Sequence, residues 1–245
     1  MTIKTTIFNK KIKQLILLII VVCMGVLNTM AQTQNTIQFI HKVGVDTLQL
    51  QQEYTNSFGE KFSVNRFKYY VSNIQINNQN VNEFVNKYYL IDEADSSTKK
   101  ISFSTHFNEI TSISFVLGVD SIKNVSGVQT GVLDPINGMF WTWNSGYIMA
   151  KLEGVSTSAK VAGNLFSHHI GGYKWNENTV RKITLSIPKT NQQKQQNLAI
   201  NVDVLKWFQS VHSIQISNHP ICHSTGNLAK QIADNYATMF SISTP

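Results

Sequence analysis

Hydrophobic and polar residues alternate along most of this chain, and the alternation predicts β-strands. A period of two places every second side chain on the same face of a strand, so one face is buried while the other stays polar. The clearest runs are residues 48–50, 67–76, 113–117, 147–152, 183–187 and 198–204. Polar clusters, such as residues 77–80 and 189–197, separate the runs as loops. Many short strands of this kind predict an all-β fold, and we expect an antiparallel β-sandwich.

A helical pattern replaces the alternation near the end of the chain. Leu228, Ile232 and Tyr236 recur at helical spacing, which predicts a short C-terminal helix that closes one end of the sandwich. Thr225 and Asn227 are the candidate N-cap residues of this helix, because their side chains can accept hydrogen bonds from the first helical N–H groups.

The segment 118–146 shows neither pattern, and it contains glycines at positions 118, 127, 131, 138 and 146. A loop of this length inside a domain is usually functional or disordered. Its second half is aromatic, with Trp141 and Trp143 two residues apart, and it is punctuated by Pro135. We therefore predict a long irregular loop that is ordered and builds a site.

The first 31 residues have the pattern of a cleaved secretory signal peptide. Four lysines within the first 13 residues precede an apolar stretch, residues 15–27, that is short for a membrane span. Ala31 is the small residue after which we expect cleavage. The mature chain, residues 32–245, would then be a single domain in the periplasm or outside the cell. No other apolar run is long enough to span a bilayer.

The charge of the mature chain does not favour nucleic acid as a partner. The whole chain has a formal net charge of +7, but the leader contains four lysines and no acidic residue, so the mature charge is +3. Such a small excess does not predict binding to nucleic acid or to an anionic membrane. The mature chain keeps one cysteine, Cys222, which cannot form an internal disulfide and which we expect to be buried.

A histidine pair, His168 and His169, ends one predicted strand, and two glycines follow after Ile170. Adjacent strand residues face opposite sides, so one imidazole points inward and the other outward. Imidazoles from separate strands can hold copper, zinc, iron or nickel. A single histidine is more often a surface or hydrogen-bonded residue, and the metal hypothesis depends on its combination with the tryptophan-rich loop. The cluster His219-Pro-Ile-Cys222-His223 is a weaker second candidate for copper or zinc.

Patterns typical of enzymes are missing from the sequence. There is no Gly-x-Ser-x-Gly elbow, phosphate-binding loop, Cys-x-x-Cys or His-Glu-x-x-His motif, and the sparse acidic residues do not pair convincingly for glycoside hydrolysis. We therefore predict a binding protein and not an enzyme. The alternative to metal binding is a metal-free module for carbohydrate or protein, with Trp141, Trp143 and Tyr147 as an exposed stacking surface.

Several motifs together resemble the MbnP-like copper-binding protein family, which is related to the CorA and MopE proteins. The Met-Phe-Trp-x-Trp block is the most specific of them, and the likeness extends over most of the mature chain from residue 37 onward. The motifs are residues 67–73, 117–120 with Asn124, 133–147, 151–154, 169–171 and 232–240.

The resemblance implies a periplasmic, mainly β protein that binds one copper ion, which we expect as Cu(I). By this resemblance His169 is the first candidate ligand and His41 the second, with His168 beside them. Trp141 or Trp143 is the candidate for oxidation to kynurenine, a reaction that a dihaem c-type peroxidase-like partner of the MbnH type performs in the family. Met139 is a soft side chain that could serve as a third donor.

Overall fold

The computed structural model describes residues 33–243, apart from residues 106, 108, 143 and 189–196. The predicted signal peptide and most of the predicted loop at residues 189–197 lie outside the described residues. The described sheets and helices belong to the compact unit Gln34–Pro245. None of its described helices is long and apolar enough to cross a membrane.

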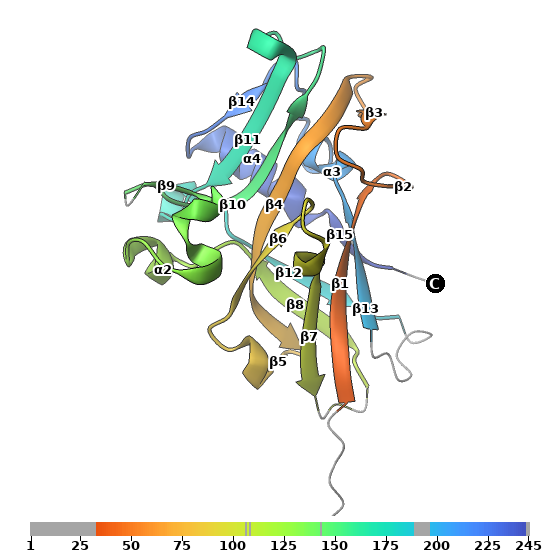
Figure 1. Cartoon of the computed structure of the whole chain (residues 1–245), viewed down its shortest axis with the longest axis vertical. Coiled ribbons are helices and arrows are strands. Elements are labelled where there is room, and N and C mark those ends of the chain that lie inside the picture. Colours follow the sequence, from red (N-terminus) through yellow and green to blue (C-terminus); the bar gives the residue numbers. More distant parts are fainter. Residues whose placement is uncertain (1–32, 106, 108, 143, 189–196, 244–245) are drawn as a thin grey trace, which may run out of the picture. The chain divides into compact units, whose positions relative to one another are not determined.

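Two β-sheets form the described part of the chain (Figure 1). In the smaller sheet the order is β15 (Phe240–Ile242), β13 (Asn197–Asp203), β1 (Thr33–Val43) and β2 (Asp46–Thr47), and β7 (Lys100–Thr105) also pairs with β1. In the larger sheet the order is β12 (Arg181–Ser186), β8 (Ser112–Leu117), β4 (Lys61–Ile76), β10 (Gly146–Val155), β11 (Leu165–Gly171) and β14 (Ile221–Cys222). Four short strands extend it: β3 (Glu53–Thr55), β5 (Gln79–Asn80) and β6 (Tyr88–Asp92) on β4, and β9 (Phe140–Thr142) on β10.

Aromatic side chains fill the space between the two sheets. Phe39 of β1 is buried and makes edge-to-face contacts with Tyr69 of β4, at 6.1 Å between ring centroids, and with Phe115 of β8, at 5.9 Å. Edge-to-face packing of this kind adds about 0.5–1.5 kcal/mol per pair beyond the burial of apolar area. The alternation of apolar residues in the sequence thus predicted a strand-dominated sandwich, and this prediction is confirmed.

The prediction that the sheets are antiparallel throughout needs correction, because both sheets are mixed. β1 pairs with β13 in parallel, and β11 pairs with β14 in parallel. Each parallel pair joins strands that are far apart in the sequence. Alternation shows which residues form a strand, but it contains no information about the direction of a distant partner.

Three α-helices occur among the described residues: α2 (Ser121–Val125), α3 (Leu205–Phe208) and α4 (Asn227–Ala237). α4 confirms the predicted C-terminal helix and lies against α3 and β12, where Asn235 donates to the carbonyl of Trp207 and Arg181 pairs with Asp234. The predicted caps are wrong, because the N-cap position is Gly226, with φ 133°, and no side chain accepts a hydrogen bond there. Short 3-10 helices complete the chain: η1 (Asn82–Phe84), η2 (Ser96–Lys99), η3 (Gly131–Leu133), η4 (Pro135–Asn137), η5 (Ala162–Asn164) and η6 (Trp175–Glu177).

A buried amide is one of the anchors of the long segment between β8 and β10. The side chain of Asn124 is fully buried, donates to the carbonyl of Val119 at 2.9 Å and accepts from the backbone N–H of Tyr147 at 2.8 Å. Gly146 has φ 78°, and a Cβ there would lie 2.2 Å from Oδ1 of Asn124, so a glycine is required. These contacts order the loop, as the aromatic content of its sequence predicted.

Candidate metal centre

The register of three strands places two histidines on the outer face of the larger sheet. Lys151 of β10 pairs with His169 of β11, and in the parallel pair of β11 with β14, His168 is opposite Cys222. Because side chains alternate between the two faces, His168 and Cys222 point into the core while His169 points outward. The next position after β14 is His223, so the parallel register brings His223 beside His169.

The rings of His169 and His223 are stacked. Their centroids are 4.1 Å apart and their planes differ by 21°. The Nε2 atom of each ring lies near the same hydroxyl, Oγ of Ser167, at 3.1 Å from His169 and 2.7 Å from His223. Partial burial lowers the pKa of His223, which favours a neutral ring there. The chain therefore holds two imidazoles together on one face.

Glu153 fixes the orientation of one ring of this pair. Its Oε1 lies 2.6 Å from Nε2 of His169, and its Oε2 accepts from the guanidinium of Arg66 at 3.0 Å. The hydrogen bond with His169 lowers the pKa of Glu153 to about 2, against the opposing effect of burial. A carboxylate in this position assigns the proton of His169 to Nε2. Nδ1 of the same ring is then the nitrogen left with a lone pair for a ligand.

Trp141 covers the same face one step further along β11. A Cβ added at Gly171 would lie 2.7 Å from Cζ3 of the indole and 2.7 Å from the carbonyl of Tyr147, so the ring rests directly on the glycine backbone. Side chains two residues apart on a strand share a face, and they are separated by roughly 7 Å. The indole of Trp141 thus lies on the face that carries His169.

His168, the inward member of the histidine pair, has no ring nitrogen left for a ligand. Its Nε2 donates to the carbonyl of His219 at 2.6 Å, and its Nδ1 accepts from Nε1–H of Trp207 at 3.0 Å. Burial lowers its pKa to about 4, so the ring is neutral in the core. The structure places His168 in the hydrogen-bonded core of the protein, apart from the outer pair.

His41 is also enclosed by hydrogen bonds within the core. Its Nδ1 lies 2.6 Å from Glu93, and its Nε2 lies 2.9 Å from the hydroxyl of Tyr69. Burial lowers the pKa of His41 below its usual value and raises that of Tyr69, so the phenol donates to Nε2 and Nδ1–H donates to the carboxylate.

The structure does not bring His41 and His169 together around one ion. Tyr69, the partner of His41, pairs with Ala150 in the sheet. The adjacent residue Lys68 pairs with Lys151, and Lys151 in turn pairs with His169. Adjacent residues of a strand face opposite sides, so the two histidines lie on opposite faces of this sheet. Sequence reasoning could place each histidine on a strand, but it could not tell which face of the sheet each strand would present.

The other residues predicted for the metal site or the stacking surface do not lie on the outer face among the described residues. Met139 is fully buried in the hydrophobic core. Trp143 lies outside the described residues. Tyr147, a member of the proposed stacking surface, is fully buried, and its hydroxyl donates to the carbonyl of Leu133 at 2.8 Å. Among the described residues, no group of three or more His, Cys, Asp or Glu side chains has the geometry of a metal site.

His223 is the residue that sequence reasoning left out of the main site, although it belongs to the weaker cluster His219–His223. The histidine pair on β11 and the cluster His219–His223 lie side by side, because β14 pairs in parallel with β11. The sequence does not reveal this, since the two segments are about 50 residues apart.

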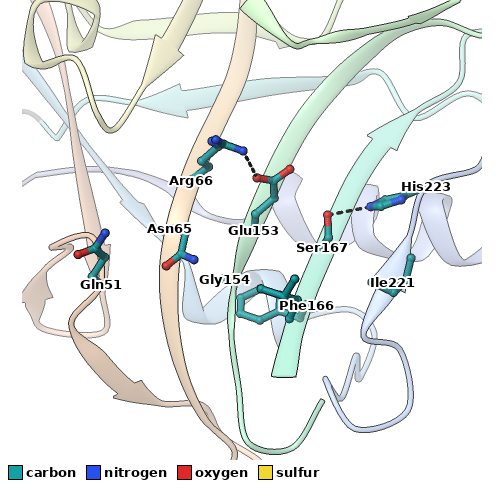
Figure 2. Close-up of a pocket in the computed structure, with 10 residues that line it drawn as sticks. Gln51, Asn65, Arg66, Glu153, Gly154, Phe166, Ser167, Ile221 and His223 are labelled. Atoms are coloured by element: carbon teal, nitrogen blue, oxygen red, sulfur yellow. Dashed lines mark hydrogen bonds and ion pairs between the residues drawn. The ribbon is translucent and has the colours of Figure 1, made fainter. Parts of the chain in front are cut away.

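A groove of about 560 Å³ opens on the outer face beside the histidine pair (Figure 2). Figure 2 shows Arg66 joined to Glu153 across β4 and β10, and Ser167 joined to His223 across β11 and the segment after β14. Leu165 and Ile221 contribute exposed apolar surface to the groove, above the buried ring of Phe166. Gln51 and Asn65 border its opposite side. His223 is the member of the imidazole pair that lines the groove.

These features define a class of protein: a strand-rich sandwich with a paired-histidine site on the outer face of one sheet. Residues 32–224 match the MbnP family, and the chain belongs to that family. It is similar in fold to a solved structure, MbnP from Methylosinus trichosporium, with a TM-score of 0.52 and 12% sequence identity over 74% of this chain and 79% of the other. Among curated proteins, none matches the chain in sequence.

Proposed function

We propose that this MbnP-family protein is a periplasmic copper-binding protein that holds one Cu(I) ion at the pair His169 and His223. The observation that supports the proposal is the stacked pair itself, with ring centroids 4.1 Å apart. Neither Nδ1 atom of the pair has a hydrogen-bond partner among the described residues. Neutral imidazole suits copper, and membership of the family supports copper over other metals.

Glu153 supports the proposal because ligating histidines usually donate their second ring N–H to a carboxylate or carbonyl. That outer hydrogen bond fixes the tautomer, orients the ring and makes the ligand nitrogen more basic. His169 has such a partner at 2.6 Å. In this role Glu153 is a positioning residue, while the two imidazoles are the proposed ligands.

Trp141 is the tryptophan that we propose for oxidation by a dihaem partner, because its indole lies on the face that carries His169. An unmodified indole offers no lone pair to a metal. Oxidative opening to kynurenine would create an aryl amine and a carbonyl close to the pair. Intact mass of the mature protein from its own organism, followed by peptide mapping, tests this assignment, and an unmodified Trp141 in copper-loaded protein contradicts it.

Anaerobic Cu(I) titration against a chromophoric chelator tests the copper site. We expect one ion per wild-type chain and loss of that ion in both His169→Ala and His223→Ala. The matched control is His212→Ala, because His212 pairs with Asp234 of α4 outside the proposed site. Wild-type stoichiometry and affinity in both site variants would remove the pair from the proposal.

The alternative function, a metal-free carbohydrate or protein module, has less support. Its stacking surface required an exposed Tyr147, and that ring is buried. We propose a binding role without catalysis for the copper site. A glycan array with copper-free protein would revive the alternative if it gave specific binding that Trp141→Ala abolishes.

A further inference from the structure

The groove beside the histidine pair has a polar side that the copper proposal does not use. Gln51, Asn65 and Arg66 line it. The side chains of Gln51 and Asn65 have no hydrogen bond to another described residue. The guanidinium of Arg66 donates to Glu153 at 3.0 Å. Two amides and most of a guanidinium therefore remain available to a ligand in the groove.

A β-bulge directs two consecutive side chains toward the groove. Arg66 pairs with Glu153, but the next residue of β10, Gly154, pairs with Val64, so Asn65 is an extra residue on β4. As a result Asn65 and Arg66 are both exposed, although neighbouring strand residues normally face opposite sides. A Cβ at Gly154 would lie 1.9 Å from the carbonyl oxygen of Ser63, so the close approach of the strands depends on glycine. Bulges often redirect side chains beside functional sites.

The backbone at Gln51 is also unusual. Its φ is 67°, a left-handed conformation that costs a non-glycine residue of the order of 1 kcal/mol, and its N–H donates to the carbonyl of Val64 at 2.8 Å. The hydrogen bond ties Gln51 to the strand residue that precedes the bulge. The three polar side chains are therefore held on one side of the groove by backbone geometry.

The charges around the groove favour an anion. Among the described residues that line the groove, Glu153 is the one carboxylate, and it is shared by Arg66 at 3.0 Å and Lys151 at 3.8 Å. Lys68, on the same face, is already neutralised by Asp92 at 2.8 Å. Lys151 lies outside the groove lining, and its ammonium donates to the carbonyl of Gly138. Arg66 is therefore the cation that a ligand in the groove can reach. The side chain of Arg66 is 65% exposed and can turn toward a ligand.

We propose that this groove binds the C-terminal carboxylate of a short peptide. Arg66 receives the carboxylate, since a guanidinium fits a carboxylate with two parallel hydrogen bonds. The amides of Asn65 and Gln51 pair with the peptide backbone, which offers both donors and acceptors. The exposed apolar side chains of Leu165 and Ile221 accept an aliphatic side chain. The peptide site requires no metal, and its polar groups are separate from the proposed copper ligands.

The test is an NMR titration of copper-free, full mature protein with the tripeptide Gly-Gly-Leu and with its C-terminal amide. We expect the acid to shift the amide signals of the groove residues and to bind at least about tenfold more tightly than the amide. Only the acid offers Arg66 a charged acceptor with two oxygens. Arg66→Gln should remove the difference between acid and amide, while Arg66→Lys should keep part of it. Lys61→Gln, at the exposed ion pair with Glu53 on the same strand, is the control and should behave as wild type.

Equal binding of acid and amide, no groove shifts at millimolar peptide, or an unchanged preference in Arg66→Gln would each overturn the proposal. The result is independent of the copper site, because His169→Ala should lose copper and retain peptide binding. If peptide binding fails while copper titration succeeds, only the inference about the groove is lost.

Discussion

The two histidine environments of this protein differ in how fully the ring nitrogens are engaged by other protein groups. His41 and His168, in the core, have both ring nitrogens engaged by protein groups. His169 and His223, on the outer face, are stacked together, and their described hydrogen bonds involve only Nε2. Burial distinguishes His41 and His168 from the other described histidines, but these two rings have no nitrogen free for a ligand. His169 and His223 are less buried, and each has an Nδ1 that no other described residue engages. Hydrogen-bond capacity, more than burial, therefore indicates which histidine can take a ligand.

The largest expected difference between the two environments is in stability. His168→Ala should lower the free energy of unfolding by about 3 kcal/mol or more, because it leaves Trp207 Nε1–H and the carbonyl of His219 unpaired in the core and opens a cavity. His169→Ala, on the partly exposed face, should cost less than about 1 kcal/mol. Urea denaturation of both variants measures the contrast, and equal losses would contradict the assignment of roles.

An intermediate effect is expected at Glu153, which acts on the outer pair alone. Glu153→Gln keeps the shape of the side chain but removes the charged acceptor of the His169 hydrogen bond. We expect a 10- to 100-fold loss of Cu(I) affinity, the usual effect of removing such a partner, with unchanged stoichiometry. Glu53→Gln, at the exposed pair with Lys61, is the matched control. Chelator competition at fixed pH decides the question, and wild-type affinity in Glu153→Gln would show that the carboxylate does not support a ligand.

The smallest effect concerns the pH dependence of stability through His41. Burial lowers the pKa of His41 in the folded protein, and Lys99 lowers it further. The carboxylates of Glu93 and Asp92 raise it, but burial is the largest effect. The unfolded chain therefore binds a proton at a higher pH than the folded chain does. The stability that depends on neutral His41 is present above the unfolded pKa near 6.5 and falls as the pH drops below it.

Urea denaturation of copper-free protein at pH 7.5 and pH 5.5 measures this effect. His41→Gln should be less stable at both values, but it should lose less on acidification than the wild type. A variant that loses as much as the wild type would show that His41 does not contribute to the pH dependence.

The sequence predicted the strands well because their signal is local. Apolar alternation at Ile113, Phe115 and Leu117 is a property of six consecutive residues and marks β8 without any knowledge of its neighbours. The same is true of helix α4, where Ile232 and Tyr236 are buried on one face. The N-cap prediction failed because it looked for a side-chain acceptor at Thr225 or Asn227. The N-cap is Gly226, which has no side chain to form such a hydrogen bond.

The candidate site could be predicted only in part. His169 was chosen from its motif, and Trp141 was one of two candidate tryptophans. The structure places both residues on one face of the sheet. His223 was placed in a separate, weaker cluster, and His41 was assigned to the same site as His169. Both choices depended on which strands would become neighbours, and no local pattern contains that information.

The amino-acid sequence by itself determined the strand-rich class of this protein, the position of its C-terminal helix α4 and the residue types available for a soft metal. Those features follow from side-chain periodicity and from the chemistry of single residues. Only the tertiary structure decided that β14 lies parallel to β11, which places His223 against His169. It also decided that β1 of the other sheet packs against the core face of the larger sheet, which separates His41 from that pair. The reason is physical: strand alternation fixes two possible faces for each side chain, but long-range pairing and register select which faces meet.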